Sequence, residues 1–493
     1  MNLLFSFIIF VWALRIFKNV LAYVQLWWIK EYRFDRMLVH LGTTQGKRIL
    51  WPKWKRPPVK PKTILLATST LTALYILFVF LPFLPIVNVL LVDLFSFPMT
   101  GALVFLFNMP TKLYHTVLIG LATRKLRLHV PMTVIGITGS YGKTSVKDYL
   151  ATILAEKFTV FKTEASKNSP IGIAEVVLKN LRPDHEIFVV EMGAYKRGEI
   201  AGMARMVKPQ IGIITAINPQ HQDLFGTIEN TMKAKYELVA GLVGKKLAII
   251  NTDDSRVRTM GEWALRDGRD VWWWSKEVHS SQFTAHGKKT FQAREINVLL
   301  NGVEFTCEVD KEKVRVQAFV LGEHQVSNIL AAVAGAVACG MNFTDAAAGA
   351  AKIRPAKSVM QKVDGMNGST FIDDTFNNNP DAAKAALSFL AKAKGRKILV
   401  FQPMIELGSY AVTSHKEIGK FAGSVCDEII LMNNSFYQEF SNGVRTSNAL
   451  KVPQVMSAHK AVDYLNKILR KDDTVLFKGK EAGLVLRHIS MVT

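Results

Sequence analysis

The feature that most restricts the fold of this 493-residue chain is an apolar stretch, residues 63–108, in which Asp93 is the only charged residue. A helix of about 20 apolar residues spans a bilayer, so the stretch is long enough for two crossings. Pro82 and Pro85 lie near its middle, where they mark an expected turn between helices over 63–84 and 86–108. A buried core of a soluble domain is the alternative.

Residues 2–28 form a second apolar segment, which Arg15 and Lys18 interrupt. No basic residues precede the segment and no small-residue cleavage site follows it, so we expect a membrane helix rather than a signal peptide. Arg15 and Lys18 would then snorkel or face protein, and an interfacial amphipathic helix is the alternative.

The distribution of charge indicates how such helices would be oriented. The loop 30–62 carries ten Lys or Arg residues against Glu31 and Asp35. Because basic loops stay on the cytoplasmic side, we expect three helices with the N-terminus outside. Residues 1–128 would form a multi-pass anchor in the cytoplasmic membrane, with lipid as a partner and the rest of the chain in the cytoplasm.

The composition of the remaining chain excludes some functions. The net charge is +22, but residues 131–493 form no basic stripe interleaved with aromatic residues, so we expect no nucleic-acid partner. The three cysteines, Cys307, Cys339 and Cys426, form no C-x-x-C pair. This spacing fits a reducing compartment and argues against a cysteine-based zinc cluster.

A glycine-rich loop begins the part of the chain that is not apolar. Residues 136–145 read G-I-T-G-S-Y-G-K-T-S, between a β-branched run and a helical pattern. In that setting, backbone N–H groups and a helix N-terminus bind phosphate. A strict Walker A loop needs a glycine where Ile137 stands, and an ordinary glycine turn is the alternative. We expect the loop to bind nucleotide through Gly139, Ser140, Gly142, Lys143, Thr144 and Ser145.

From residue 131 onward, strand and helix patterns alternate, which predicts an α/β fold with parallel sheets. Expected strands are 134–137, 187–191, 211–216 and 246–250, and a local β-hairpin is expected within 271–320. A second α/β unit begins near Ile353. We therefore expect a central P-loop ATP-binding domain over 129–352 and a Rossmann-like C-terminal domain over 353–493.

Two residues after strands are candidate metal ligands. Glu191 ends one expected strand, and His221 follows another. Ligands of parallel sheets bind at the carboxyl ends of strands, and a carboxylate with an imidazole suits Mg²⁺ or Mn²⁺. A surface glutamate and a structural histidine are the alternatives.

The order of several motifs resembles the Mur ligase family, the ATP-dependent amide ligases of peptidoglycan precursor synthesis. The resemblance covers about residues 134–479. The motifs are Thr138-Gly-Ser-Tyr-Gly-Lys-Thr-Ser145, Asn168-Ser-Pro-Ile-Gly172, Glu191-Met-Gly, the His221 segment, Lys233-Ala-Lys-Tyr-Glu237, Asn251-Thr-Asp-Asp254, Gly322-Glu-His-Gln-Val-Ser-Asn328, Asp373-Asp-Thr-Phe-Asn-Asn-Asn-Pro380 and Glu406-Leu-Gly408.

The resemblance implies a role for each matching position. Lys143 and Thr144 would bind ATP phosphates and Mg²⁺, while Glu191 and His221 would be metal ligands. Lys235 matches a carbamylated lysine, whose carbamate would also bind the metal. The alternative interpretation of Lys235 is a solvated lysine on a helix. Lys143, Lys235 and His221 would be catalytic. The nucleotide would also contact His324 and Asn328 and, from the C-terminal domain, Asp374 and Asn379.

The implied reaction forms an amide through an acyl phosphate. A carboxylate acceptor, muramyl-peptide-like or lipid-linked, would attack ATP, and an amino acid or dipeptide amine would then displace phosphate.

Some features depart from the family pattern. Membrane segments stand in place of an N-terminal uridine-binding domain, and Ser358-Val359 replace a Gly-Arg pair. Gln402-Pro-Met404 and Lys478-Gly-Lys-Glu481 replace two further C-terminal motifs. A polyglutamate-type ligase and a catalytically weakened ATP-binding scaffold are therefore alternatives.

Overall fold

The computed structural model describes residues 2–42, 46, 49–52, 54–129, 131–164, 167–218, 225–276, 289–299, 301–355, 358–405, 407–447 and 452–490. The chain divides into two compact units, Met1–Gly120 and Leu121–Thr493. Each unit has its own buried core.

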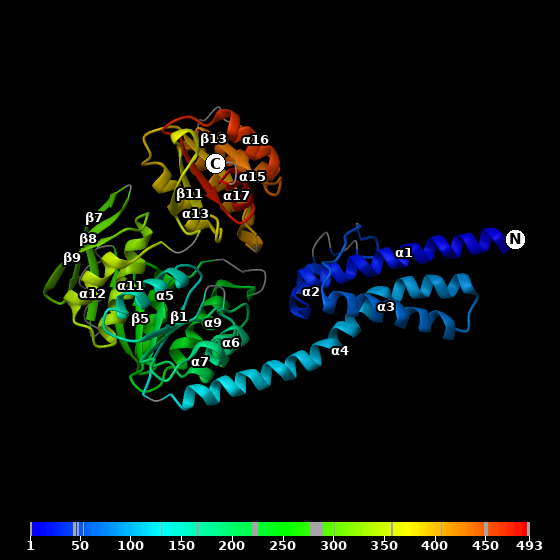
Figure 1. Ribbon diagram of the computed structural model, residues 1–493, viewed down its shortest axis with the longest axis horizontal. Helices are drawn as coiled ribbons and strands as arrows, with labels where there is room; N and C mark the ends of the chain where they lie inside the picture. Colours follow the sequence, from blue (N-terminus) through cyan, green and yellow to red (C-terminus); the bar gives the residue numbers. More distant parts are fainter. Residues whose placement is uncertain are drawn as a thin grey trace. The chain divides into compact units, whose positions relative to one another are not determined.

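The first unit is helical (Figure 1). It contains α1 (Asn2–Ile29), the short α2 (Phe34–Leu41), α3 (Pro61–Phe80) and most of α4 (Pro85–Arg127). Three helical segments are long and apolar enough to cross a membrane: Ser6–Ile29, Pro61–Phe80 and Pro85–Arg127. Large apolar side chains remain on the outer surface of α1, α3 and α4, such as Phe10, Tyr75 and Phe105.

Two helix boundaries differ from those expected from the sequence. The helix expected over 63–84 ends at Phe80, because Leu81 precedes Pro82 and adopts an extended conformation. The helix expected over 86–108 instead continues to Arg127. The charges that begin at Lys112 end the apolar pattern, but lysine, arginine and leucine are good helix formers, so the helix does not stop there.

A polar cluster joins α1 to α4 inside the first unit. The Arg15 guanidinium lies 2.8 Å from the Asp93 carboxylate. Asn19 and Trp12 also donate hydrogen bonds to Asp93, at 3.0 Å and 3.3 Å. Arg15 therefore faces protein, and the single acidic residue of the apolar stretch is paired.

The second unit begins with a nine-stranded sheet of order β2-β3-β1-β4-β5-β6-β7-β8-β9. Its strands are β1 (Thr133–Thr138), β2 (Val160–Lys162), β3 (Ile187–Glu191), β4 (Ile211–Ile214), β5 (Leu247–Asn251), β6 (Asp270–Ser275), β7 (Lys289–Leu299), β8 (Gly302–Val309) and β9 (Glu312–Ala318). The pairs from β2 to β7 are parallel, which confirms the predicted α/β fold with a parallel sheet.

The hairpin expected within 271–320 is present, because β7 pairs antiparallel with β8, but it is not isolated from the main sheet. β7 pairs in parallel with β6 and antiparallel with β8, so the hairpin and β9 extend the main sheet. The local pattern predicted the hairpin, but the pairing of β6 with β7 depends on tertiary contacts.

Helices cover both faces of this sheet (Figure 1). The helices α5 (Lys143–Leu154), α11 (His324–Ala338) and α12 (Phe343–Gly349) pack on one face. The opposite face carries α9 (Ile228–Ala240) and α10 (Ser255–Arg266). Two further α-helices of this part of the chain are α6 (Pro170–Asn180) and α7 (Glu199–Val207).

A six-stranded sheet of order β10-β11-β15-β12-β13-β14 follows. Its strands are β10 (Gln361–Asp364), β11 (Thr370–Asp374), β12 (Lys397–Phe401), β13 (Glu428–Leu431), β14 (Gln454–Val455) and β15 (Thr474–Lys478). One face packs on α13 (Pro380–Leu390), α14 (Ala411–Val425) and α15 (Tyr437–Arg445), and the other on α16 (Ala458–Ile468) and α17 (Ala482–Ser490). This is the three-layer arrangement expected for the C-terminal domain.

The close packing of α14 and α15 makes a testable prediction for stability. A Cβ atom on Gly443 would lie 2.0 Å from the carbonyl oxygen of Lys416 on α14. Because both helices would have to separate, Gly443→Ala should lower the free energy of unfolding by about 1–3 kcal/mol, measured by thermal or denaturant unfolding.

The matched control is Gly202→Ala on α7, where the nearest atom to the added Cβ is Arg205 Nη2 at 3.9 Å. This substitution should stabilise the helix by about 0.5–1 kcal/mol. Equal effects of the two substitutions would contradict the packing argument.

Candidate active site

The glycine loop connects β1 to α5 and is held from both sides. Gly139 and Gly142 have φ values of +151° and +80°, and a Cβ on Gly139 would lie 2.0 Å from Thr215 Oγ1. The Ser140 amide donates to the Ala216 carbonyl at 2.7 Å. Glycine is required at position 139 because both the backbone conformation and the neighbouring strand exclude a side chain.

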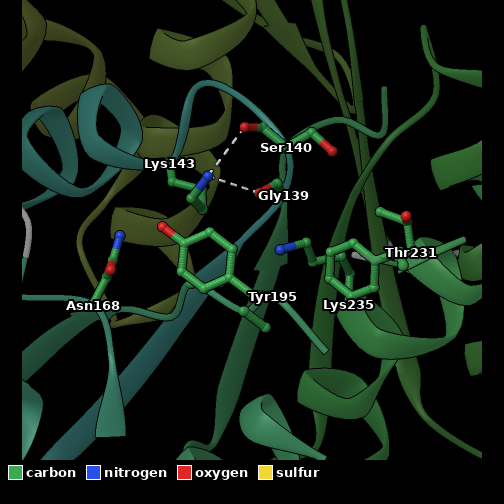
Figure 2. Close-up of a pocket in the computed structure, with 10 residues that line it drawn as sticks. Gly139, Ser140, Lys143, Asn168, Tyr195, Thr231 and Lys235 are labelled. Carbon is green, nitrogen blue, oxygen red and sulfur yellow. Dashed lines mark hydrogen bonds between the residues drawn. The ribbon is translucent and has the colours of Figure 1, made fainter. Parts of the chain in front are cut away.

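Lys143 folds back over this loop. Its ammonium donates to the carbonyl oxygens of Gly139 at 2.8 Å and Ser140 at 3.1 Å (Figure 2). Burial lowers the pKa of Lys143, and the Glu191 charge partly offsets this effect. An anion at the loop would offer the ammonium a charged partner in place of two carbonyl groups.

Glu191, at the carboxyl end of β3, is the centre of a polar network. The Thr144 hydroxyl donates to its Oε2 atom at 3.0 Å, and the Asn168 amide donates to Oε1 at 2.9 Å. Lys147 lies 3.4 Å from Oε2. Burial alone would raise the pKa of Glu191, but the charges of Lys143 and Lys147 and the hydrogen bonds from Asn168 and Thr144 together hold the pKa below its ordinary value.

Strand register explains why these groups meet. Ile137 of β1 is paired with Glu191 of β3, and Thr138 with Ile214 of β4. The carboxyl ends of three neighbouring parallel strands therefore lie at one edge of the sheet, where ligands of such sheets bind.

Lys235 lies on α9 and is 4% exposed. Its amine points into a pocket that also contains Lys143 (Figure 2), and the pocket is lined by Gly139, Ser140, Lys143, Asn168, Gly193, Ala194, Tyr195, Phe225, Thr231 and Lys235. Burial, with a smaller contribution from the Lys143 charge, lowers the pKa of Lys235 to about 7. A large fraction of this amine is therefore neutral and nucleophilic at neutral pH, which is the form that can react with CO₂.

The donors near the loop fit a hard divalent cation. Thr144 and Glu191 bring a hydroxyl and a carboxylate together, and Mg²⁺ is usually bound by one or two carboxylates together with phosphates and water. Within the described ranges, no group of three or more His, Cys, Asp or Glu residues could hold a metal. The predicted ligand His221 lies outside the described residues.

His324 and Asn328 occupy the first turns of α11. A Cβ on Gly142 would lie 2.7 Å from Asn328 Oδ1, so Asn328 borders the glycine loop. Burial lowers the pKa of His324 to about 4, although the Asp374 charge acts in the opposite direction. Among the described residues, the buried Nδ1 atom of His324 has no hydrogen-bond partner, which leaves it available to a ligand.

The two expected C-terminal contacts are engaged with protein groups. Asp374 is buried and pairs with Lys478 at 2.6 Å. Asn379 caps α13, because its Oδ1 atom accepts a hydrogen bond from the Ala382 amide at 3.0 Å. A nucleotide contact at either residue would have to share or replace these bonds.

Sequence reasoning missed Lys147, Asn218 and Lys478 as site residues. A signal existed for Lys147, since it follows Lys143 by four positions and so lies on the same helix face. The contacts of Asn218 and Lys478 depend on how distant segments pack, and no local pattern predicts them.

This geometry, with a glycine loop between a parallel strand and a helix and a buried carboxylate beside it, defines a phosphate-binding α/β protein of the P-loop type. Residues 137–336 match the model of the Mur ligase middle domain, and residues 360–481 match that of the Mur ligase glutamate ligase domain. Together these matches cover more than half of the chain, and the chain belongs to the Mur ligase family.

Known proteins show the same similarity. The UDP-N-acetylmuramoyl-tripeptide–D-alanyl-D-alanine ligase of Escherichia coli is 30% identical over 301 residues, which are 60% of this chain and 63% of that protein. The same-named ligase of Haemophilus influenzae is 30% identical over 62% of this chain and 65% of that protein. The chain therefore spans slightly less than two thirds of these relatives. A crystal structure of MurF from Acinetobacter baumannii matches with a TM-score of 0.68 and 25% identity, over 76% of this chain and 80% of that chain.

The burial of Lys235 makes a prediction that separates stability from activity. Its pKa falls from 10.5 to about 7 on folding. At any pH below 10.5, folding must therefore either remove the proton from Lys235 or bury its positive charge, and both cost stability. Lys235→Met should therefore raise the melting temperature, most strongly below pH 7, and the gain should decline as the pH rises from 7 towards 10.5.

Melting temperatures of both proteins across pH 6–10 measure this effect, and an ATP-dependent ligation assay should show loss of activity in the same variant. The control is Lys179→Met, which changes an exposed lysine near the end of α6. A pH-independent difference between Lys235→Met and wild type would contradict the lowered pKa.

Proposed function

We propose that this chain is a membrane-anchored, ATP-dependent amide ligase of peptidoglycan precursor synthesis. The observation that carries the proposal is the meeting of Lys143, Thr144, Glu191 and Lys235 around the glycine loop. Membership of the Mur ligase family supports the reaction type, because Mur ligases are ATP-dependent amide ligases.

In the first step, an oxygen of the acceptor carboxylate attacks the γ-phosphorus of ATP. The bond between that phosphorus and the β–γ bridging oxygen breaks, and ADP leaves an acyl phosphate behind. Backbone N–H groups of the loop and the Lys143 ammonium would hold the phosphates and neutralise their charge. Thr144 and Glu191 would hold Mg²⁺, which supplies charge neutralisation when bound; His221 is the further proposed ligand.

In the second step, the amine of the donor attacks the acyl carbon. The carbon–oxygen bond to phosphate breaks, the amide forms, and the amine loses a proton. A carbamate on Lys235 would replace a buried amine, whose pKa is lowered mainly by burial and further by the Lys143 charge, with an anion that attracts Lys143. Ser140, Gly142, Ser145, His324 and Asn328 would contact the nucleotide, with Asp374 and Asn379 from the C-terminal domain.

We propose a UDP-muramoyl tripeptide as the acceptor and D-alanyl-D-alanine as the donor, because these are the substrates for which the related ligases are named. A lipid-linked acceptor is a second candidate that the apolar helices favour. Mass spectrometry of the product distinguishes these two candidates from each other and from a polyglutamate-type ligase. Full-length protein in nanodiscs is given ATP and a panel of amino acids and dipeptides as donors. The acceptors are muramyl peptides that carry either UDP or a lipid.

The ligase proposal predicts sustained release of ADP and phosphate over many turnovers only when acceptor and donor are both present. Lys143→Ala should lower kcat by about 10²–10³-fold, because a charged donor to the transferred phosphoryl group is lost. Lys179→Ala, at an exposed position, is the control. Full-rate ATP hydrolysis without substrates, or unchanged function of Lys143→Ala in cells, would instead support the ATP-binding scaffold.

We further propose that residues 1–128 form a multi-pass anchor in the cytoplasmic membrane, with ATP-binding (129–352) and C-terminal (353–493) domains in the cytoplasm. With Cys307, Cys339 and Cys426 changed to serine, Lys55→Cys should react with a membrane-impermeant maleimide only from the cytoplasmic side. Phe83→Cys, between α3 and α4, should react only from the outer side. Labelling of both positions from one side would contradict the three-crossing anchor.

A further inference from the structure

Asn218 lies just after β4, and its backbone is fixed by the glycine loop. The Ser140 hydroxyl accepts a hydrogen bond from the Asn218 amide at 3.1 Å and donates one to the Asn218 carbonyl at 3.3 Å. Asn218 is 2% exposed. The Ser140 side chain therefore satisfies both backbone groups of Asn218. A shift of the loop would move Asn218 as well.

The side chain of Asn218 points to a different part of the unit. Its Nδ2 atom donates to Asp381 Oδ2 at 3.0 Å and approaches Asn379 Oδ1 at 3.4 Å. Both partners belong to the start of α13, where Asn379 is the cap and Asp381 lies in the first turn. Asn218 thus connects the phosphate loop of the central domain to a helix of the C-terminal domain.

A second observation places the same turn beside the loop. Burial raises the pKa of Tyr141, and the charges of Asp381, Asp254 and Asp253 raise it further. The phenol next to Ser140 is therefore kept protonated in a region that is rich in carboxylates. A neutral carboxamide at position 218 suits this region, since it donates to Asp381 without adding another negative charge.

We propose that Asn218 is a positioning residue that couples occupancy of the phosphate loop to the first turn of α13. The inference rests on the proposed function, because it takes the loop as the site of the ATP phosphates. Lys143 donates hydrogen bonds to the carbonyl groups of Gly139 and Ser140, and a phosphate at the loop would compete for its ammonium. A resulting movement of Ser140 would shift Asn218, which is bonded to the first turn of α13.

The size of the effect follows from the chemistry of the contact. A hydrogen bond to a carboxylate is stronger than one between neutral groups, and its gain or loss shifts a two-state equilibrium by about tenfold or more. Asn218 would therefore bias the C-terminal domain towards the position in which α13 lies against an occupied loop.

A charge-exchange experiment tests this coupling in the full-length protein in nanodiscs, with the ATP analogue AMP-PNP and Mg²⁺ as the probe. Hydrogen–deuterium exchange of the amides of residues 381–386 reports on α13, and calorimetry reports on AMP-PNP affinity. In the wild type, AMP-PNP should slow exchange in this turn by about tenfold. Asn218→Asp should abolish most of this response, because two carboxylates would face each other.

The double variant Asn218→Asp/Asp381→Asn should recover the response, since the amide at position 381 can then donate to the carboxylate at position 218. A purely structural role of Asn218 would not produce this rescue. In the ligase assay, Asn218→Asp should lower kcat more than it raises the KM for ATP, and the double variant should reverse that change.

Asp345→Asn is the matched control, because Asp345 lies in the first turn of α12, where its amide donates to the capping residue Asn342 at 2.7 Å. It should leave the response of α13 unchanged. An undiminished response in Asn218→Asp with normal AMP-PNP affinity, or a folded double variant that does not recover, would overturn the coupling alone. A wild-type protein that does not bind AMP-PNP would overturn the nucleotide site, and the coupling with it.

Discussion

The buried carboxylate of Glu191 is the interaction on which the candidate site depends. It accepts hydrogen bonds from the hydroxyl of Thr144 on α5 and the amide of Asn168 before α6, while its own backbone amide donates to Thr163. An unpaired carboxylate at this depth would cost several kcal/mol, so these partners are needed for folding as well as for chemistry. The segments that would contact a metal-bound phosphate in the proposed function are thus held together by one side chain.

Three lysines lie near Glu191: Lys143 and Lys147 act on its carboxylate, and Lys235 lies in the adjoining pocket. Burial lowers the pKa of Lys143 and, with the Lys143 charge, that of Lys235, while the charges of nearby glutamates act in the opposite direction. A polyphosphate would supply further negative charge, which is a physical reason to regard this pocket as an anion site.

Local sequence predicted the elements of the site better than their contacts. The strand, glycine loop and helix around Lys143 follow from β-branched residues, glycines and helix formers that are adjacent in the chain, and Glu191 was found because it ends a strand. By contrast, the partnership of Asn218 with Asp381 joins residues 163 positions apart. The joining of β7 to β6 and the length of α4 were missed for related reasons, since sheet pairing is non-local and a change in polarity does not end a helix. The proposed role of His221 stays a prediction, because this residue lies outside the described part of the chain.

The first unit contains a partly buried carboxylate, Asp93, which is paired with neighbouring side chains as Glu191 is in the second unit. Asp93 on α4 is bonded by Arg15, Asn19 and Trp12, all from α1. If these helices lie in lipid, apolar contacts alone cannot fix how they are aligned, because lipid chains are as apolar as leucine side chains. A charged group that has partners on only one face of one neighbouring helix can fix both the rotation and the register of the pair. Asp93 would then set the alignment of α1 and α4 much as Glu191 sets that of α5 and β3, although no catalytic role is required of it.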